Sequence, residues 1–148
     1  MLLSDDSKRQ QFARSVAHLM SVYKFDGWLL NVENSVRPAL MSNLVDLAKR
    51  LNEECKRVNS SAKIIWYDSV TYPEGNLAWQ DELNEKNKIF FDHCDGIFLN
   101  YCWRTGHLIK SLSMAGQRRL DVYVGIDVFG KNLISNTLVL FFAMISDY

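Results

Sequence analysis

A short pattern that occurs twice restricts the fold of this chain more than any other feature. The first copy is Phe25–Asn31, with the letters FDGWLLN, and the second is Cys94–Asn100, with the letters CDGIFLN. Each copy reads as an Asp-Gly turn followed by a short apolar strand with a polar residue at its end. Segments 63–68 and 121–127 follow the same scheme. The sequence therefore predicts four strands, which end near Glu33, Asp68, Tyr101 and Asp127.

Apolar residues at helical spacing fill the segments around these strands. Before the first strand they are Phe12, Val16, Leu19 and Tyr23, and after it they are Leu40, Leu44, Leu47, Leu51, Cys55 and Val58. Further helices are predicted around 82–90 and 107–116. We expect Asn34 or Ser35 to cap the second helix, with Pro38 in its first turn.

Apolar strands that alternate with amphipathic helices indicate an α/β fold with a parallel sheet covered by helices. Repeats of about 30 residues suit a β/α barrel or an open doubly wound sheet. A complete barrel needs about 250 residues, so the four strands predict a partial (β/α)8 TIM-type barrel. A four-stranded flavodoxin-like sheet is the alternative, although no Gly-rich phosphate loop follows any strand.

The two parts of the chain differ in pattern. Residues 1–130 are interpreted as the partial barrel, and residues 131–148 as a divergent apolar tail. Within the tail, the uncharged run 138–145 is too short to span a bilayer. It is either a buried strand or a non-homologous tail from splicing or read-through, and we favour the second.

Composition excludes several classes of function. Seventeen Lys and Arg residues balance seventeen Asp and Glu residues, so we expect neither a nucleic-acid nor a membrane partner. Three Cys residues without a C-x-x-C motif and three scattered His residues indicate neither a disulfide framework nor a zinc site. Because the first residues also lack an apolar signal core, a cytosolic protein is predicted.

Polar side chains gather at the predicted strand ends, where α/β barrels place their active sites. Asn31 and Glu33 are two positions apart, so both can project to one side. The next strands end at Tyr67 and Asp68, then at Asn100, Tyr101 and Trp103, then at Asp127. Asp127 is either a substrate-binding residue or a solvated strand terminus.

A carboxylate beside a carboxamide suits one particular reaction. Retaining glycosidases ordinarily use two carboxylates, but a sugar with a 2-acetamido group can supply its own nucleophile. Such an enzyme needs one proton donor, which Glu33 can provide, and one group to orient the acetamide, which Asn31 can provide. The motif alone is equally compatible with a helix cap at Asn34 preceded by solvated polar residues.

The wider string resembles the signature of cytosolic endo-β-N-acetylglucosaminidases, the family 85 glycoside hydrolases. The first matching block is Phe25–Asn34. Later blocks in the same order are WYDSV from Trp66, WQDELN from Trp79, FFD from Phe90, CDG from Cys94, NYCW from Asn100 and RLDVYVGIDVF from Arg119. The resemblance covers roughly residues 10–130 of the sequence.

The resemblance implies a β/α barrel that cuts the β-1,4 bond between the two core GlcNAc residues of N-glycans, with retention and without a cofactor. It implies that Glu33 is the general acid and then the base, and that Asn31 helps the acetamide close to an oxazolinium. Tyr67 is expected to hydrogen-bond that acetamide. The remaining predicted substrate-binding residues are Trp79, Asn100, Trp103 and Asp127. The expected partners are N-glycans of glycoproteins, glycopeptides or free oligosaccharides.

Two other functions remain as alternatives. The chain could be an inactive glycan-binding or interaction module derived from the same barrel, or an independent flavodoxin-like domain that binds a small ligand. The first hypothesis remains a hydrolase fragment or isoform that retains its catalytic pair.

Overall fold

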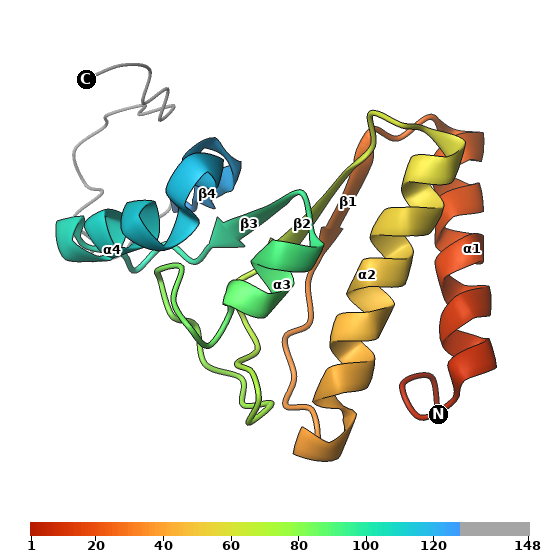
Figure 1. Cartoon of the computed structure of the whole chain (residues 1–148), viewed down its shortest axis with the longest axis horizontal. Helices are drawn as coiled ribbons and strands as arrows, with labels where there is room; N and C mark the ends of the chain where they lie inside the picture. Colours follow the sequence, from red (N-terminus) through yellow and green to blue (C-terminus); the bar gives the residue numbers. More distant parts are fainter. Residues whose placement is uncertain (128–148) are drawn as a thin grey trace.

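The structure, a computed structural model, describes residues 1–127 and contains a four-stranded sheet with helices between the strands (Figure 1). In chain order the elements are α1 (Asp6–Tyr23), β1 (Gly27–Leu30), η1 (Pro38–Leu40), α2 (Met41–Val58), β2 (Lys63–Tyr67), α3 (Lys88–His93), β3 (Gly96–Leu99), α4 (Thr105–Ala115), η2 (Gly116–Asp121) and β4 (Val122–Val124). The strands lie in the order β1-β2-β3-β4, and every neighbouring pair is parallel. The predicted alternation of strands and helices is confirmed.

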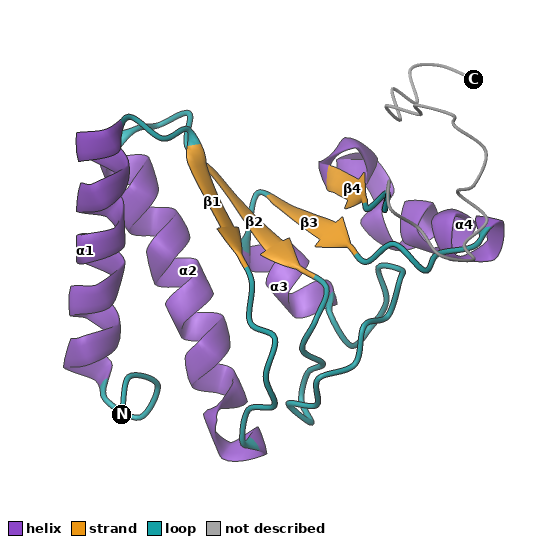
Figure 2. Cartoon of the chain, turned by 180° about the vertical axis from the view of Figure 1, so that it is seen from behind, coloured by secondary structure: helices purple, strands orange, loops and turns teal. Residues whose placement is uncertain are grey.

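One face of the sheet forms the main core. Ile64 and Trp66 of β2 and Ile97 of β3 are buried against α2 and α3, which lie on the same side of the strands in both views (Figures 1 and 2). The Trp66 ring stacks on Phe90 of α3 with 4.0 Å between centroids. Because side chains alternate along a strand, the residues between these positions face the other side of the sheet.

The first two helices pack against each other through a different stripe from the one that the sequence pattern marks. Ala13, Ala17 and Met20 are the buried apolar residues of α1, and the two small alanines allow close approach to α2. Phe12 and Leu19, which belong to the predicted stripe, are 41% and 45% exposed.

Charged groups hold the amino ends of the strands together. The Asp95 carboxylate accepts hydrogen bonds from Lys56 Nζ of α2 and from the backbone N–H of Ile64, the latter at 2.9 Å. These contacts join α2, β2 and the turn before β3 at the edge opposite the predicted site. Asp95 therefore has a structural role, as its place in an Asp-Gly turn indicates.

Two local predictions are wrong. The turn before α2 begins at Pro38, and Arg37, rather than Asn34 or Ser35, occupies the position before it. The third helix begins at Lys88 and not near Glu82, because the polar residues before it take part in a buried hydrogen-bond network described below. By contrast, α4 (Thr105–Ala115) lies close to the predicted helix 107–116.

No helix within residues 1–127 is both long enough and apolar enough to cross a bilayer. The predicted apolar tail, 131–148, lies outside the described residues.

Candidate active site

The predicted site residues follow the carboxyl ends of the strands, which meet at one edge because the sheet is parallel (Figure 2). Asn31 comes directly after β1, Tyr67 is the last residue of β2, and Asn100 comes directly after β3. This edge carries the longest loop of the described structure, between β2 and α3.

Asn31 and Glu33 lie on either side of Val32 in the segment that follows β1. Val32, which separates them, packs against the core, and its carbonyl accepts a hydrogen bond from Ser69 Oγ at 2.8 Å. Asn31 and Glu33 are both exposed, so a ligand can reach them.

Tyr67 lies at the centre of the site. Its hydroxyl donates a hydrogen bond to Asn100 Oδ1 at 3.0 Å. The pKa of Tyr67 is raised from 10.0 to about 12; burial is the largest cause, and the nearby charge of Glu33 contributes more than the charges of Tyr101 and Asp68. Tyr67 is therefore protonated at neutral pH, and Glu33 of the β1 loop lies within electrostatic range of it.

Two exposed aromatic side chains border this centre. Trp79, in the loop after β2, and Tyr101, after β3, are each 43% exposed. A hydrogen bond from the Trp79 side chain partly offsets the rise in the pKa of Tyr67, which places the indole beside the phenol. Exposed aromatic rings next to a polar centre provide the apolar faces on which sugar rings stack.

A buried carboxylate anchors the loop that carries Trp79. Asp68 is 1% exposed, and its Oδ2 accepts the backbone N–H groups of Gln80 and Asp81 at 3.0 and 2.8 Å. Its Oδ1 accepts Asn87 Nδ2 at 3.0 Å. Burial raises the pKa of Asp68 to about 6, although these three hydrogen bonds oppose the shift.

Asp81 was missed as a candidate from the sequence. Its Oδ1 accepts Asn100 Nδ2 at 2.7 Å and the backbone N–H of Cys102 at 3.0 Å. It thereby ties the loop after β2 to the end of β3. The only sequence signal was its place in the WQDELN block, because spacing along the chain does not reveal a contact between two loops.

Trp103 and Asp127 lie toward the β4 side of the edge. The Trp103 indole N–H donates to the carbonyl of Gly125 at 2.8 Å, and Asp127 is the last described residue. The structure thus brings Glu33, Tyr67, Trp79 and Asn100 together, whereas Trp103 contacts the segment after β4 and Asp127 belongs to that segment.

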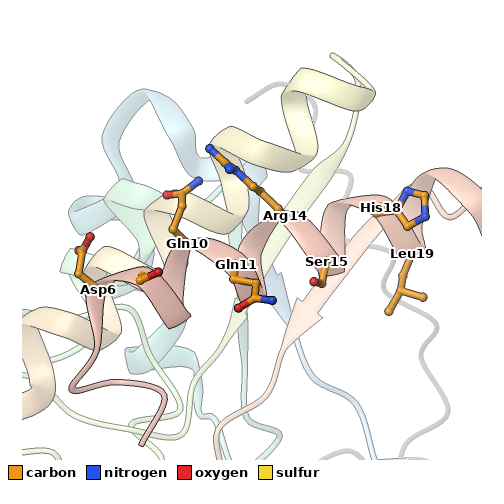
Figure 3. Close-up of a pocket in the computed structure, with 8 residues that line it drawn as sticks. Asp6, Gln10, Gln11, Arg14, Ser15, His18 and Leu19 are labelled. Carbon is orange, nitrogen blue, oxygen red and sulfur yellow. The ribbon is translucent and has the colours of Figure 1, made fainter.

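A shallow open depression also occurs on α1, away from these residues (Figure 3). All of its lining residues lie between Asp6 and Leu19, so it is a surface of a single helix. Within residues 1–127, no group of three or more His, Cys, Asp or Glu side chains is placed to hold a metal ion.

Comparison with known proteins assigns the chain to a family. Residues 1–139 match the family described as glycosyl hydrolase family 85. The chain belongs to glycoside hydrolase family 85. It is 44% identical to human cytosolic endo-β-N-acetylglucosaminidase and to cytosolic endo-β-N-acetylglucosaminidase 2 of Arabidopsis thaliana, in each case over 88% of its own length. It is 42% identical to the mouse protein.

The family 85 chain is short beside these relatives. It spans 17% of the human protein and 18% of the mouse and Arabidopsis proteins. Its fold is similar to the glycoside hydrolase domain of Endo-D from Streptococcus pneumoniae R6, with a TM-score of 0.63 over 83% of this chain and 23% of that one, at 22% identity. The four parallel strands are therefore part of a β/α barrel, and the flavodoxin-like alternative is wrong.

Proposed function

We propose that this chain is the catalytic segment of an endo-β-N-acetylglucosaminidase that hydrolyses the GlcNAc-β1,4-GlcNAc bond in the core of N-glycans. The observation that carries the proposal is the convergence of Glu33, Tyr67 and Asn100 from three strands at one edge. The names of the family relatives, which include the word cytosolic, support this activity and a cytosolic location.

The first half of the proposed reaction needs no protein nucleophile. The carbonyl oxygen of the substrate's 2-acetamido group attacks the anomeric carbon while Glu33 donates a proton to the departing glycosidic oxygen. The C–O bond to the leaving GlcNAc breaks, and a cyclic oxazolinium forms. Asn31 and Tyr67 hold the acetamide in its attacking pose, and such orientation can lower the barrier by several kcal/mol.

In the second half, Glu33 acts as a base. It removes a proton from a water molecule, the water oxygen bonds to the anomeric carbon, and the ring opens to restore the acetamide. Two displacements at one carbon give retention of configuration. The exposure of Glu33 gives water access to this carboxylate.

The remaining predicted residues bind the glycan in this proposal. Trp79 is the best placed to stack on a sugar ring, because it is exposed beside Tyr67. Asn100, Trp103 and Asp127 lie toward the β4 side of the edge and would contact sugars farther from the cleaved bond. The substrates are N-glycans of glycoproteins, glycopeptides or free oligosaccharides.

The test is release of sugar from a fluorescently labelled high-mannose glycopeptide, with mass spectrometry of the products. We expect the peptide to keep a single GlcNAc, and we expect Glu33→Gln to remove activity because it cannot donate the proton. Asn31→Ala should still bind the glycopeptide but lose turnover. Glu74→Gln, which changes an exposed loop carboxylate, is the matched control and should stay active. Full activity of Glu33→Gln would refute the assignment.

A glycan-binding module without turnover is the second candidate. The exposure of Trp79 and Tyr101 favours it, since two accessible aromatic rings can bind sugars without a complete barrel. In the same assay this function would appear as glycopeptide binding that Trp79→Ala weakens, with no product formed by the unaltered chain.

A further inference from the structure

Both ends of the Asn100 side-chain amide form a hydrogen bond. Asn100 is 7% exposed, its Nδ2 donates to Asp81 Oδ1, and its Oδ1 accepts from the Tyr67 hydroxyl. An ionised carboxylate can only accept hydrogen bonds, so it selects the NH2 end of the amide. The oxygen end must then face Tyr67, and Tyr67 must direct its single hydrogen at Asn100.

Asp81 is itself held in place. Its backbone has a φ of 59°, a left-handed conformation that Asp and Asn tolerate better than most residues. Its N–H donates to the buried Asp68, and its Oδ1 also accepts the N–H of Cys102. Contacts with the loop after β2 and with the segment after β3 therefore fix the carboxylate that orients Asn100.

We propose that Asp81 is a positioning residue that, through Asn100, fixes the Tyr67 hydroxyl so that its oxygen faces the ligand only as a hydrogen-bond acceptor. The proposal rests on the proposed function and deepens it. Because the Trp79 indole already donates toward this oxygen, the ligand must supply a donor to its remaining lone pair. In a 2-acetamido sugar that donor is the acetamide N–H.

Closure of the acetamide to the oxazolinium benefits from this orientation of the Tyr67 hydroxyl. As the carbonyl oxygen bonds to the anomeric carbon, positive charge develops on the acetamide nitrogen and its N–H becomes a stronger donor. An acceptor fixed in advance stabilises that charge more in the transition state than in the ground state. A Tyr67 hydroxyl free to rotate would instead present its hydrogen to the same N–H part of the time.

Two substitutions of Asp81 separate this role from a structural one. Asp81→Gly removes the carboxylate, and glycine adopts the left-handed backbone readily. Asp81→Asn removes the same charge but keeps an oxygen that can accept from Asn100 and Cys102. The backbone hydrogen bond to Asp68 is available to both variants.

The first readout does not depend on turnover. In the full chain labelled with 13Cζ-tyrosine, the Tyr67 signal is identified by its absence in Tyr67→Phe, and its pKa is measured by titration. We expect the pKa of Tyr67 to be lower in Asp81→Gly than in Asp81→Asn by about half a unit or more, because a flipped Asn100 would favour the tyrosinate. Equal values in the two variants would overturn the proposal.

The second readout is kinetic and uses the labelled high-mannose glycopeptide. We expect Asp81→Gly to lower kcat about tenfold with little change in KM, and Asp81→Asn to restore most of the loss. Equal losses in both variants would contradict the positioning role. Lack of turnover in the unaltered chain would count against the proposed function alone, since the tyrosine titration still decides the role of Asp81. Should Asp81→Gly unfold, the Tyr67 pKa of Asp81→Asn is compared with that of the unaltered chain. The positioning role predicts similar values, and a clear difference would overturn it.

Discussion

The Glu33 carboxylate and the Tyr67 phenol belong to segments far apart in the sequence, and the charge of Glu33 acts on Tyr67 across two loops that the hydrogen bond from Ser69 Oγ to the Val32 carbonyl joins directly. The charge of Glu33 is the second-largest cause of the raised pKa of Tyr67, after burial. A charge acts on another group through space, so the effect can be removed by neutralising Glu33 without disturbing the fold.

We therefore predict that Glu33→Gln lowers the pKa of Tyr67 from about 12. The value should stay above the ordinary value of 10, because burial is the larger cause and is unchanged. Titration of 13Cζ-tyrosine, with Tyr67→Phe for assignment, measures the change. Glu74→Gln serves as the control and should leave the titration unaltered. An unchanged pKa in Glu33→Gln would contradict the electrostatic contact between Glu33 and Tyr67.

Asp68 gives the second prediction at this scale. Its pKa is raised from 3.8 to about 6 by burial, so the folded chain holds this proton to a higher pH than the unfolded chain. Its contribution to stability is then fully present below pH 3.8 and is lost as the pH rises to about 6. A shift of this size corresponds to about 3 kcal/mol.

Urea unfolding at several values between pH 4 and pH 7 tests this. We expect Asp68 to lower the free energy of unfolding of the unaltered chain as the pH rises, whereas Asp68→Asn should show no such decrease from this position. The difference in free energy of unfolding between the two proteins should therefore change across that range. Asp92→Asn, which alters an exposed carboxylate paired with Lys88, should run parallel to the unaltered chain. A constant difference between Asp68→Asn and the unaltered chain would contradict the raised pKa.

At the scale of elements, the Asp-Gly pairs have a physical explanation. A Cβ added to Gly27 would lie 1.8 Å from the carbonyl oxygen of Lys63, and one added to Gly96 would lie 2.6 Å from that of Asp121. Each glycine therefore allows its strand to approach the start of the next strand. The repeated motif marks the amino ends of β1 and β3.

We predict that Gly27→Ala destabilises the chain by about 1–3 kcal/mol, because the clash is with backbone and cannot be relieved by a side-chain rotation. Gly106→Ala is the matched control. Its Cβ would meet nothing within 4 Å, and it lies in the first turn of α4, so it should be neutral or stabilising by about 1 kcal/mol at most. Urea unfolding of the two variants measures both effects, and equal stability would contradict the explanation.

The same elements show what the sequence could predict. Strand order and the placement of Asn31, Tyr67 and Asn100 at one edge follow from local patterns, since parallel strands separated by helices end on the same side. The start of α3 could not be placed, because the segment before it is held by Asp68 and Asn87. Those contacts join residues that are distant in sequence, so the local hydrophobic pattern cannot predict them.

Two apolar surfaces remain open in the molecule as a whole, as far as residues 1–127 describe it. On the sheet face away from α2 and α3, Leu29 is 52% exposed and Tyr123 is 38% exposed. On α1, the exposed apolar residues are Phe12, Leu19, Val22 and Tyr23. A closed β/α barrel covers the corresponding surfaces with the inward side chains of its other strands and with a neighbouring helix.

These surfaces predict that the 148-residue chain associates with itself when it is produced alone. Exposed apolar patches drive association, and within residues 1–127 the outer edge of β1 pairs with no other strand. Leu29→Glu places a charge in the middle of the open face, so it should shift the chain toward monomer, whereas Gln11→Glu on exposed α1 surface adds the same charge away from that face. Sedimentation velocity at several protein concentrations compares them. If Leu29→Glu and Gln11→Glu sediment alike, the open sheet face does not drive the association. The exposed apolar residues of α1 are then the surface to alter next.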